Sequence, residues 1–282
     1  MQEKTMDDQS LVSIKEFSSG VPLLSDIFSG LNSPEFSSLA SYSYQYLIKA
    51  AGELKNYPWI KDSFHQWSRI LEYPYVYCQI KEQIASRARI LDAGSGVTFF
   101  PFFLSQAYRV DCIDQDDYLS IYSAIGKKMS VDISFRQGNL TKLPFDNATF
   151  DCVYCVSVLE HTDRYPEIVA EFHRVLKPGA KLVLTFDIAL DGNQFGVSQE
   201  SAGRLLSCLK ESFVLDQAAD VLLKNLNAAN IYSTHLLSSK GMYDLLPWPK
   251  FGWKQLLWSL LKGRPIVNNP NLTFCLLMGS KL

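Results

Sequence analysis

From Arg89 onward, short apolar runs alternate with longer stretches in which apolar residues recur at helical spacing. Short apolar runs bounded by turn residues are typical of buried strands, and their alternation with helices is the pattern of a parallel sheet covered on both faces. We expect strands at 89–93, 109–114, 133–137, 150–156, 181–186, 213–215 and 272–278. Helices are expected at 99–106, 118–129, 166–175 and 198–211. The pattern therefore predicts an α/β fold.

The first third of the chain has a different pattern, helical and rich in aromatic residues. Ser33 can cap a helix whose first residue is Pro34. Two further helices are predicted at 59–71 and 74–85, separated because the residue before Pro74 resists helical geometry. The aromatic residues either pack these helices on the sheet or form a lid that excludes water from a site.

These patterns predict a domain organisation. Residues 1–20 are polar and lack a period, which predicts a flexible tail; residues 21–86 are expected to form a helical cap, and residues 87–282 the α/β domain. Late in the chain the alternation falters, so we expect a substrate-covering helical insertion within 189–262. The apolar positions at 253–261 share one helical face, which packs on the core or touches a membrane or lipid.

The composition narrows the class of protein. With 282 residues and 47% hydrophobic content, the chain can bury a full core. Its net charge of −2 gives no attraction to a phosphate backbone, which argues against a nucleic-acid substrate. No apolar run approaches the roughly 18 residues needed to cross a bilayer, and the polar N-terminus is unlike a signal peptide. We therefore expect a cytoplasmic protein with no transmembrane segment; its oligomeric state is not predicted.

The cysteines do not suggest a metal or redox site. Cys152 and Cys155 form the only C-x-x-C spacing among the six cysteines, and both fall in the predicted strand at 150–156. Residues three apart in a strand point to opposite faces, so the two thiols cannot meet. We interpret the cysteines as small core residues and expect no bound metal.

A glycine-containing turn directly follows the predicted strand at 89–93, with Gly94 and Gly96. Without Cβ atoms, such a turn lets backbone N–H groups approach a ligand. Asp114, at the tip of the next strand, can accept both hydroxyls of a ribose. This predicts a nucleoside-containing cofactor, although an ordinary strand-to-helix turn has the same pattern. Phe99 occupies the place of the third glycine in the nicotinamide fingerprint, which counts against a dinucleotide.

Four ordered segments resemble the class I S-adenosylmethionine-dependent methyltransferases. They are Leu91-Asp92-Ala93-Gly94-Ser95-Gly96; Ile113-Asp114; Gly138-Asn139-Leu140 with Leu143-Pro144-Phe145 and Phe150-Asp151; and Val158-Leu159-Glu160-His161 with Leu176-Lys177-Pro178-Gly179. The resemblance implies a Rossmann-like, doubly wound, mostly parallel seven-stranded sheet, and S-adenosylmethionine as the cofactor. It leaves the flanks uncovered, and in this family the flanks choose the substrate.

The resemblance also implies the cofactor-binding residues, which follow the first four strands: Asp92, Gly94, Gly96, Asp114, Gln115, Asn139, Leu140, Cys155 and Val156. Asp92, Gly94 and Gly96 would hold the methionine end, Asp114 the ribose and Gln115 the adenine edge. Asn139 and Leu140 would contact the adenine amine and ring, and Cys155 and Val156 would line the path near the sulfonium. Two positions depart from the family pattern. Thr98 replaces a third glycine but can cap a helix that begins at Phe99. The family often has an aspartate at the position of Asn139, but the amide oxygen of Asn139 can accept a hydrogen bond from the adenine amine.

Catalysis by such an enzyme needs a nucleophile held in line with an activated methyl group and, where necessary, removal of a proton. His161, just past the fourth strand, is the candidate base because an imidazole titrates near neutral pH; it equally fits a role in holding its loop. Glu160 is a candidate partner of His161, and Asp187 at the tip of the fifth strand could reach the substrate.

The resemblance implies a methyltransferase, and we expect it to act on a small-molecule, sugar or lipid-like acceptor at oxygen. A nucleic-acid methyltransferase is the first alternative. It is disfavoured because Cys155-Val156-Ser157-Val158 stands where adenine-amine enzymes carry Asn/Asp-Pro-Pro-aromatic, and because no proline precedes Cys155, as cytosine-carbon enzymes require. The second alternative is a catalytically silent cofactor-binding subunit, which intact binding residues alone do not exclude.

Overall fold

The computed structural model describes residues 17–58, 61, 64–65, 67–247 and 270–282. Its centre is one seven-stranded sheet in the order β3-β2-β1-β4-β5-β7-β6. The strands are β1 Arg89–Ala93, β2 Arg109–Asp114, β3 Ile133–Gln137, β4 Phe150–Val156, β5 Leu176–Ala189, β6 Phe213–Leu215 and β7 Leu272–Lys281. The first five are parallel, and β7 runs antiparallel between β5 and β6. The predicted α/β, mostly parallel seven-stranded fold is confirmed.

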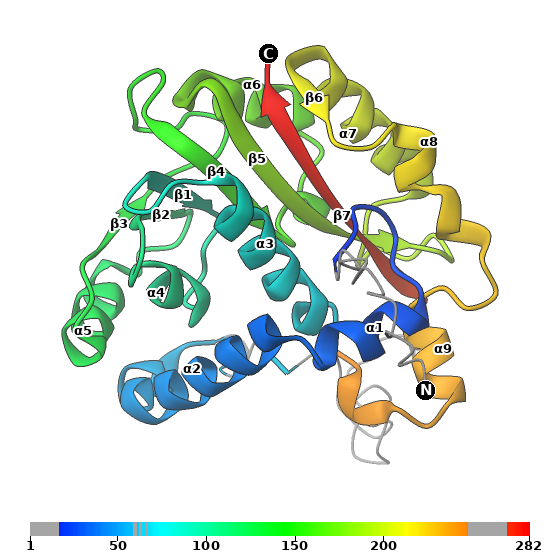
Figure 1. Cartoon of the computed structure of the whole chain (residues 1–282), viewed down its shortest axis with the longest axis horizontal. Helices are drawn as coiled ribbons and strands as arrows, with labels where there is room; N and C mark the ends of the chain where they lie inside the picture. Colours follow the sequence, from blue (N-terminus) through cyan, green and yellow to red (C-terminus); the bar gives the residue numbers. More distant parts are fainter. Residues whose placement is uncertain (1–16, 59–60, 62–63, 66, 248–269) are drawn as a thin grey trace, which may run out of the picture.

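Helices cover both faces of the sheet (Figure 1). On one face lie α3 Arg69–Gln83, α4 Phe100–Leu104 and α5 Leu119–Met129; on the other lie α6 Tyr165–Val175 and α7 Gln199–Ser212. Alternate residues of β4 supply the two cores, since Cys152 and Tyr154 face the α3 side whereas Val153 and Cys155 face the α6 side. The period of two in the buried strands therefore builds two hydrophobic layers.

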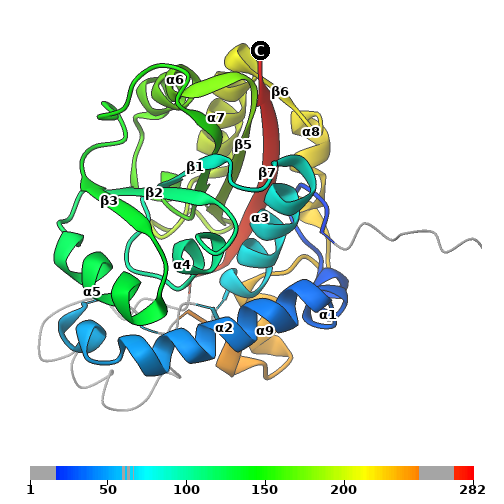
Figure 2. The same cartoon turned by 60° about the vertical axis from the view of Figure 1, so that its left-hand side comes forward.

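The N-terminal helices α1 Leu24–Leu31 and α2 Pro34–Ala50 pack over α3, and α2 also contacts α4 and α5 (Figure 2). As predicted, Ser33 caps α2, accepting the N–H of Phe36 at 3.0 Å, and Pro34 is the first helical residue. Aromatic rings fill this layer; Phe102, for example, stacks on Tyr122 at 5.1 Å between ring centroids. Most of these rings have the packing role that the sequence allowed, and Tyr57, Trp67 and Tyr73 also line a cavity.

The prediction of two helices separated at Pro74 was wrong. A single helix, α3, runs through this position, and Pro74 is its sixth residue and fully packed. Proline lacks an N–H, so at this point it removes only the bond to the carbonyl of Ile70, while the buried neighbours stabilise the helix. Of the predicted helix at 59–71, residues 59–60, 62–63 and 66 lie outside the described residues, and the described ones before 69 form bends and turns. The 3₁₀ segment η1 Glu53–Asn56 precedes them.

The fifth strand is longer than predicted. The expected strand began at residue 181, but Lys177, Pro178 and Gly179 also belong to β5. The register between β4 and β5 shifts between Phe150 and Cys152, and this irregularity accommodates a proline without an N–H and a glycine at φ 72°. Proline and glycine, which commonly follow the end of a helix, therefore lie inside a strand here.

The late part of the chain contains α7, capped by Ser198 as predicted, followed by α8 Ala219–Leu222, η3 Lys224–Asn227, α9 Thr234–Ser239 and η4 Tyr243–Leu245. The predicted helix at 253–261 and residues 1–16 of the predicted tail lie outside the described residues.

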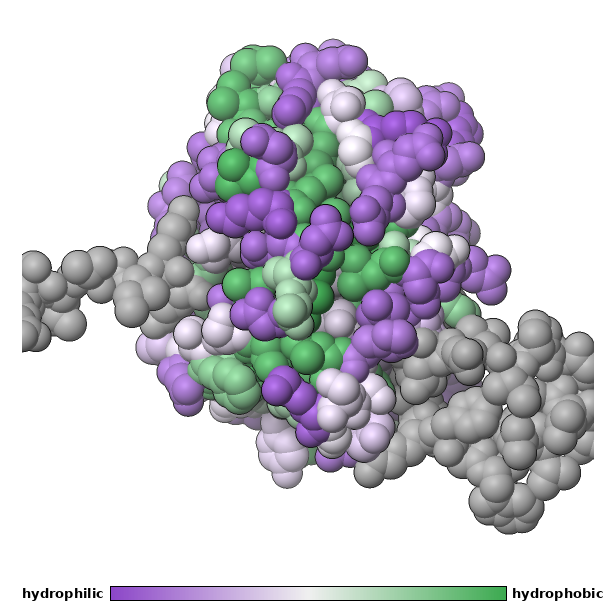
Figure 3. Space-filling view, turned by 90° about the vertical axis from the view of Figure 1, so that its right-hand side faces the viewer, coloured by the Kyte–Doolittle hydropathy of each residue, from purple (hydrophilic) through white to green (hydrophobic). Residues whose placement is uncertain are grey.

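Gly20 exchanges two backbone hydrogen bonds with Leu276 of β7. On the face beside the short edge strand β6, hydrophobic groups show between hydrophilic ones (Figure 3). Among the described helices, none has the length and apolar character needed to cross a membrane.

Candidate functional site

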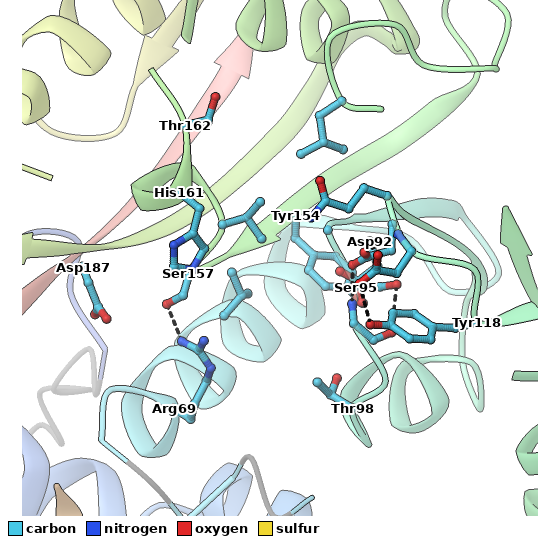
Figure 4. A pocket seen from close by; sticks show the side chains of 18 of the residues that line it. Arg69, Asp92, Ser95, Thr98, Tyr118, Tyr154, Ser157, His161, Thr162 and Asp187 are labelled. Carbon is cyan, nitrogen blue, oxygen red and sulfur yellow. Dashed lines mark hydrogen bonds between the residues drawn. The ribbon is translucent and has the colours of Figure 1, made fainter. Parts of the chain in front are cut away.

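A cavity of about 640 Å³ opens where the parallel strands end. In an open α/β sheet the carboxyl ends of the strands are the usual place for a ligand. Almost all of the residues predicted from the sequence line this one cavity: Asp92, Gly94, Gly96, Asp114, Gln115, Asn139, Leu140, Val156, His161 and Asp187. In Figure 4, Asp92, Ser95 and Tyr118 gather at one end, and Arg69, Ser157, His161 and Asp187 at the other, with Tyr154 between them.

Cys155 is the exception. Its side chain is fully buried in the core on the α6 side of the sheet, whereas Val156 and Ser157 line the cavity. Successive residues in a strand point to opposite faces, so the side chains of Cys155 and Val156, both in β4, face different sides of the sheet. The Cys155 side chain therefore does not line the cavity, and the place of this residue on the cofactor path stays a prediction.

The glycine turn is held by its neighbours through every N–H from residue 94 to residue 97. Gly94 and Ser95 donate to the carbonyl of Ile113 at 2.9 and 3.1 Å, Gly96 donates to Asp114 Oδ2 at 2.8 Å, and Val97 donates to the Tyr57 hydroxyl at 2.9 Å. The turn needs glycine, because Gly94 has φ 81° and a Cβ there would lie 2.5 Å from Val158. The turn thus shapes the cavity, but its amides already have partners.

Two carboxylates lie at this end of the cavity. Asp114 is oriented by backbone N–H groups, since Asp116 donates to its Oδ1 at 3.1 Å in addition to the Gly96 bond. Asp92 is only 4% exposed, and burial raises its pKa to about 8; the adjacent Tyr154 lowers this pKa and the Asp114 carboxylate raises it. A buried carboxyl group of this kind is completed by a ligand cation. The ammonium group and ribose of S-adenosylmethionine fit this pair of residues.

Two departures from the family pattern behave differently from expectation. Asn139 Oδ1 accepts the Thr141 N–H and hydroxyl, both at 2.9 Å, so the amide NH₂ rather than the oxygen is left to face a ligand. Thr98 lines the cavity and does not cap a helix; Phe99 is the N-terminal cap residue of α4 and makes no side-chain capping bond. Both residues remain at the cavity, in roles that local sequence rules did not predict.

The opposite end of the cavity is built around Arg69, which sequence reasoning missed. Arg69 Nη1 donates to Glu72 Oε2 and to the Ser157 hydroxyl, and Ser157 donates to Glu72 Oε1 at 2.7 Å. Glu72 is completely buried and also accepts the Ser68 hydroxyl at 2.9 Å. Arg69 Nε and Nη2 have no hydrogen-bond partner among the described residues. Helix α3 of the cap therefore brings an anchored guanidinium group to the tip of β4.

Titratable groups surround this guanidinium. Burial, and then the Glu72 carboxylate, raise the pKa of Asp187 to about 7. Arg69 and the Trp67 indole lower this pKa but do not offset the rise; the indole donates to Asp187 Oδ1 at 3.1 Å. Burial, and then Asp187, hold the pKa of Glu160 well above its usual range. Burial and Arg69 lower the pKa of His161, which keeps the imidazole neutral near pH 7.

Backbone strain marks the same end of the cavity. Trp67 and Ser157 have φ of 45° and 50°, a region that few residues other than glycine adopt. Trp67 is held there by a stacked contact with Tyr232 at 5.2 Å and by a hydrogen bond from its N–H to the carbonyl of Leu245 at 2.9 Å. Such strain persists where the surrounding structure fixes it, and it concentrates at functional sites. Within the described part of the chain, no group of His, Cys, Asp and Glu side chains could hold a metal ion.

Comparisons with known proteins agree with this geometry. Residues 91–184 match the family model of the methyltransferase domain. Phosphoethanolamine N-methyltransferase 3 of Arabidopsis thaliana is 30% identical over 102 residues, 34% of this chain and 20% of that protein. Demethylmenaquinone methyltransferase of Streptomyces avermitilis is 34% identical over 98 residues, 34% of this chain and 41% of that protein. The chain thus spans less than half the length of either relative.

The fold has a counterpart in a solved structure, geranyl diphosphate C-methyltransferase from Streptomyces coelicolor in complex with S-adenosyl-L-homocysteine. Its TM-score is 0.52 at 13% identity, over 76% of this chain and 77% of that one. The family match and the fold together confirm the resemblance predicted from the sequence. Residues 91–184 are thus similar to a methyltransferase domain, on a fold shared with a methyltransferase solved in complex with S-adenosyl-L-homocysteine.

Proposed function

We propose that the protein is an S-adenosylmethionine-dependent methyltransferase that acts on a small-molecule acceptor at oxygen. The observation that carries this proposal is the single cavity with two chemically different ends. One end offers Asp92 and Asp114 to a nucleoside and an amino-acid ammonium group. The other offers Arg69, His161 and Asp187 to a polar acceptor.

The cofactor supplies an activated methyl group on its sulfonium. For its binding, Asp92 would accept the ammonium, Asp114 the ribose hydroxyls, and Asn139 would donate from its amide to the adenine ring, with Leu140 against the ring face. Gln115, at the exposed rim beside Asp114, would lie at the adenine edge. Val156 would lie between the two ends of the cavity.

At the acceptor end, the neutral His161 imidazole can take the proton of a hydroxyl group as its oxygen becomes nucleophilic. The N–H groups on Arg69 Nε and Nη2, which have no partner among the described residues, can stabilise the negative charge that develops on that oxygen. Asp187, held by the Trp67 indole, can orient the acceptor by accepting a second hydrogen bond. This combination of donor, acceptor and base favours a hydroxyl group over an acceptor with no ionisable proton.

The size and chemistry of the acceptor are supported by two observations. The net charge of −2 offers no attraction to a nucleic-acid backbone. The two relatives named above are, by their names, enzymes of phosphoethanolamine and demethylmenaquinone, both small molecules. A small polar, glycan or lipid-like molecule with a hydroxyl group is therefore the acceptor that we propose.

The test is incubation with cofactor carrying an isotope-labelled methyl group and a fractionated cell extract. Label should enter the small-molecule, glycan or lipid fraction, and carbon NMR should identify it as a methoxy group. The control is an Asp114→Ala variant, which should transfer no label. Label in RNA, or in an N-methyl or C-methyl product, would contradict the acceptor assignment, and absence of transfer from any fraction would contradict the enzyme.

A further inference from the structure

Tyr57 connects the helical cap to the glycine turn. It follows η1, forty positions before Val97 in the sequence, yet its hydroxyl oxygen accepts the Val97 N–H at 2.9 Å. It is 8% exposed and lines the cavity. A Cβ atom at Gly96 would lie 2.9 Å from this hydroxyl, so the phenol packs directly against the turn. The cap therefore reaches the cofactor end of the cavity as well as the acceptor end.

The turn itself has few donors to offer a ligand. The N–H groups of residues 94–97 are bonded to Ile113, Asp114 and Tyr57, and the Ser95 hydroxyl donates to the Gly96 carbonyl at 3.3 Å. The amino-acid end of a cofactor whose ammonium group is held by Asp92 also carries a carboxylate, and this carboxylate needs a donor, because a buried anion without one is costly. The donor must come from a side chain that faces this part of the cavity.

The Tyr57 hydroxyl meets this requirement. Its oxygen accepts the Val97 N–H, and its proton has no acceptor among the described residues. The ring is fixed by an edge-to-face contact with Tyr118, 5.5 Å between centroids at 76°. Burial raises the pKa of Tyr57 to about 12, more than the Val97 bond lowers it, so the phenol keeps its proton at neutral pH.

We propose that Tyr57 donates its hydroxyl proton to the carboxylate at the amino-acid end of the cofactor, which makes the cap part of the cofactor site. This inference rests on the proposed function, since it concerns the same cofactor. In the bound state, Asp92 holds the ammonium and Tyr57 the carboxylate of one zwitterion. The cofactor is then enclosed between the turn and the cap, and its affinity depends on the cap being docked.

The test compares Tyr57→Phe with wild type in calorimetric titrations of two ligands. S-adenosylhomocysteine carries the amino-acid end and 5′-methylthioadenosine lacks it. Tyr57→Phe should weaken S-adenosylhomocysteine about tenfold, as expected for a hydrogen bond to a charged group, and leave 5′-methylthioadenosine unchanged. The matched control is Tyr46→Phe, in the same cap, 1% exposed and outside the cavity, which should change neither affinity.

The outcomes separate the claims. Equal weakening of both ligands would show that Tyr57 only supports the turn through Val97 and would overturn the inference, as would an unchanged affinity for S-adenosylhomocysteine. Wild-type protein that binds neither ligand would instead overturn the proposed function. Thermal unfolding of the variants followed by circular dichroism checks that the cap remains folded.

Discussion

The two ends of the cavity are held in different ways. At the cofactor end, Asp114 is positioned by the backbone N–H groups of Gly96, in the turn after the neighbouring strand β1, and of Asp116, two residues further on. At the acceptor end, Arg69, Glu72 and Ser157 are positioned by one another, although 85 residues separate Glu72 from Ser157. The Asp114 carboxylate is therefore fixed by backbone groups of the sheet and its turns. The side chains of the second end are held in place by a helix of the cap, so substitutions in the cap could alter the acceptor while the sheet stays the same.

The largest difference between the ends should appear in catalysis. His161→Ala removes the proposed base, so the single-turnover rate of methyl transfer to the labelled acceptor fraction should fall about 1,000-fold. Affinity for S-adenosylhomocysteine should stay within about twofold, because His161 lies away from Asp92 (Figure 4). His173→Ala, in α6 and outside the cavity, is the control and should leave both unchanged. An unaltered rate in His161→Ala would remove this residue from catalysis.

The acceptor end should also be the more sensitive in stability. Arg69→Met leaves the fully buried Glu72 without its cation, and the free energy of unfolding in urea should fall by about 3 kcal/mol. Lys81 lies on α3, as Arg69 does, and forms an ion pair at the surface with Glu35 of α2. Lys81→Met removes this pair and should lower the free energy of unfolding by about 0.5 kcal/mol or less. Restoration of part of the loss by adding Glu72→Gln would confirm the cause. Equal losses in the two single variants would contradict the role given to the buried pair.

At the cofactor end, Asp114→Ala should weaken S-adenosylhomocysteine about 100-fold, since two hydrogen bonds to a charged group are lost. Asp111→Ala is the matched control. Asp111 lies on the same strand but does not line the cavity, and its Oδ2 forms an ion pair with Arg89 Nε at 2.7 Å. Its affinity, measured by calorimetry, should equal that of wild type. A small effect of Asp114→Ala would show that this carboxylate does not bind the ribose.

The change in affinity for each pH unit should be smaller than the effect of Asp114→Ala, and it should depend on Asp92. Its folded pKa of about 8 lies above that of the unfolded chain, so its contribution to the stability of the ligand-free protein declines as the pH rises from about 4 to 8. A ligand ammonium requires the carboxylate, so affinity should rise with pH by up to about tenfold per unit and level off above about pH 8. Asp92→Asn should abolish this slope in titrations across the range. A wild-type affinity independent of pH would contradict the assignment.

The fold and the cofactor end could be predicted from the sequence because both depend on local patterns. Short apolar runs located the strands, and the residues at their ends, such as Asp114, lie at the strand tips. The alternation of side chains along a strand also indicates that the Cys155 and Val156 side chains face different sides of the sheet. The Asn139 side-chain oxygen accepts the N–H of Thr141, two residues further on, in an Asx turn. Asparagine commonly forms such turns with its own backbone, so this contact too depends on local sequence.

The acceptor end could not be predicted in this way. Arg69 precedes the segment that matches the family model, and nothing in its neighbourhood indicates which strand tips it faces. Its position depends on how α3 docks, and the rule that a helix ends before proline divided this helix in two. Trp67 adopts a backbone conformation that sequence rules assign to glycine, and it is retained only by its contacts with Tyr232 and Leu245. Such tertiary contacts have no sequence signature.

The most direct test of the central claim is calorimetric titration of the wild-type protein with S-adenosylmethionine, with NAD as the comparison. The cavity geometry predicts one site per chain with micromolar affinity for S-adenosylmethionine and no measurable heat with NAD. Absence of binding to S-adenosylmethionine, or equal binding to NAD, would contradict the account.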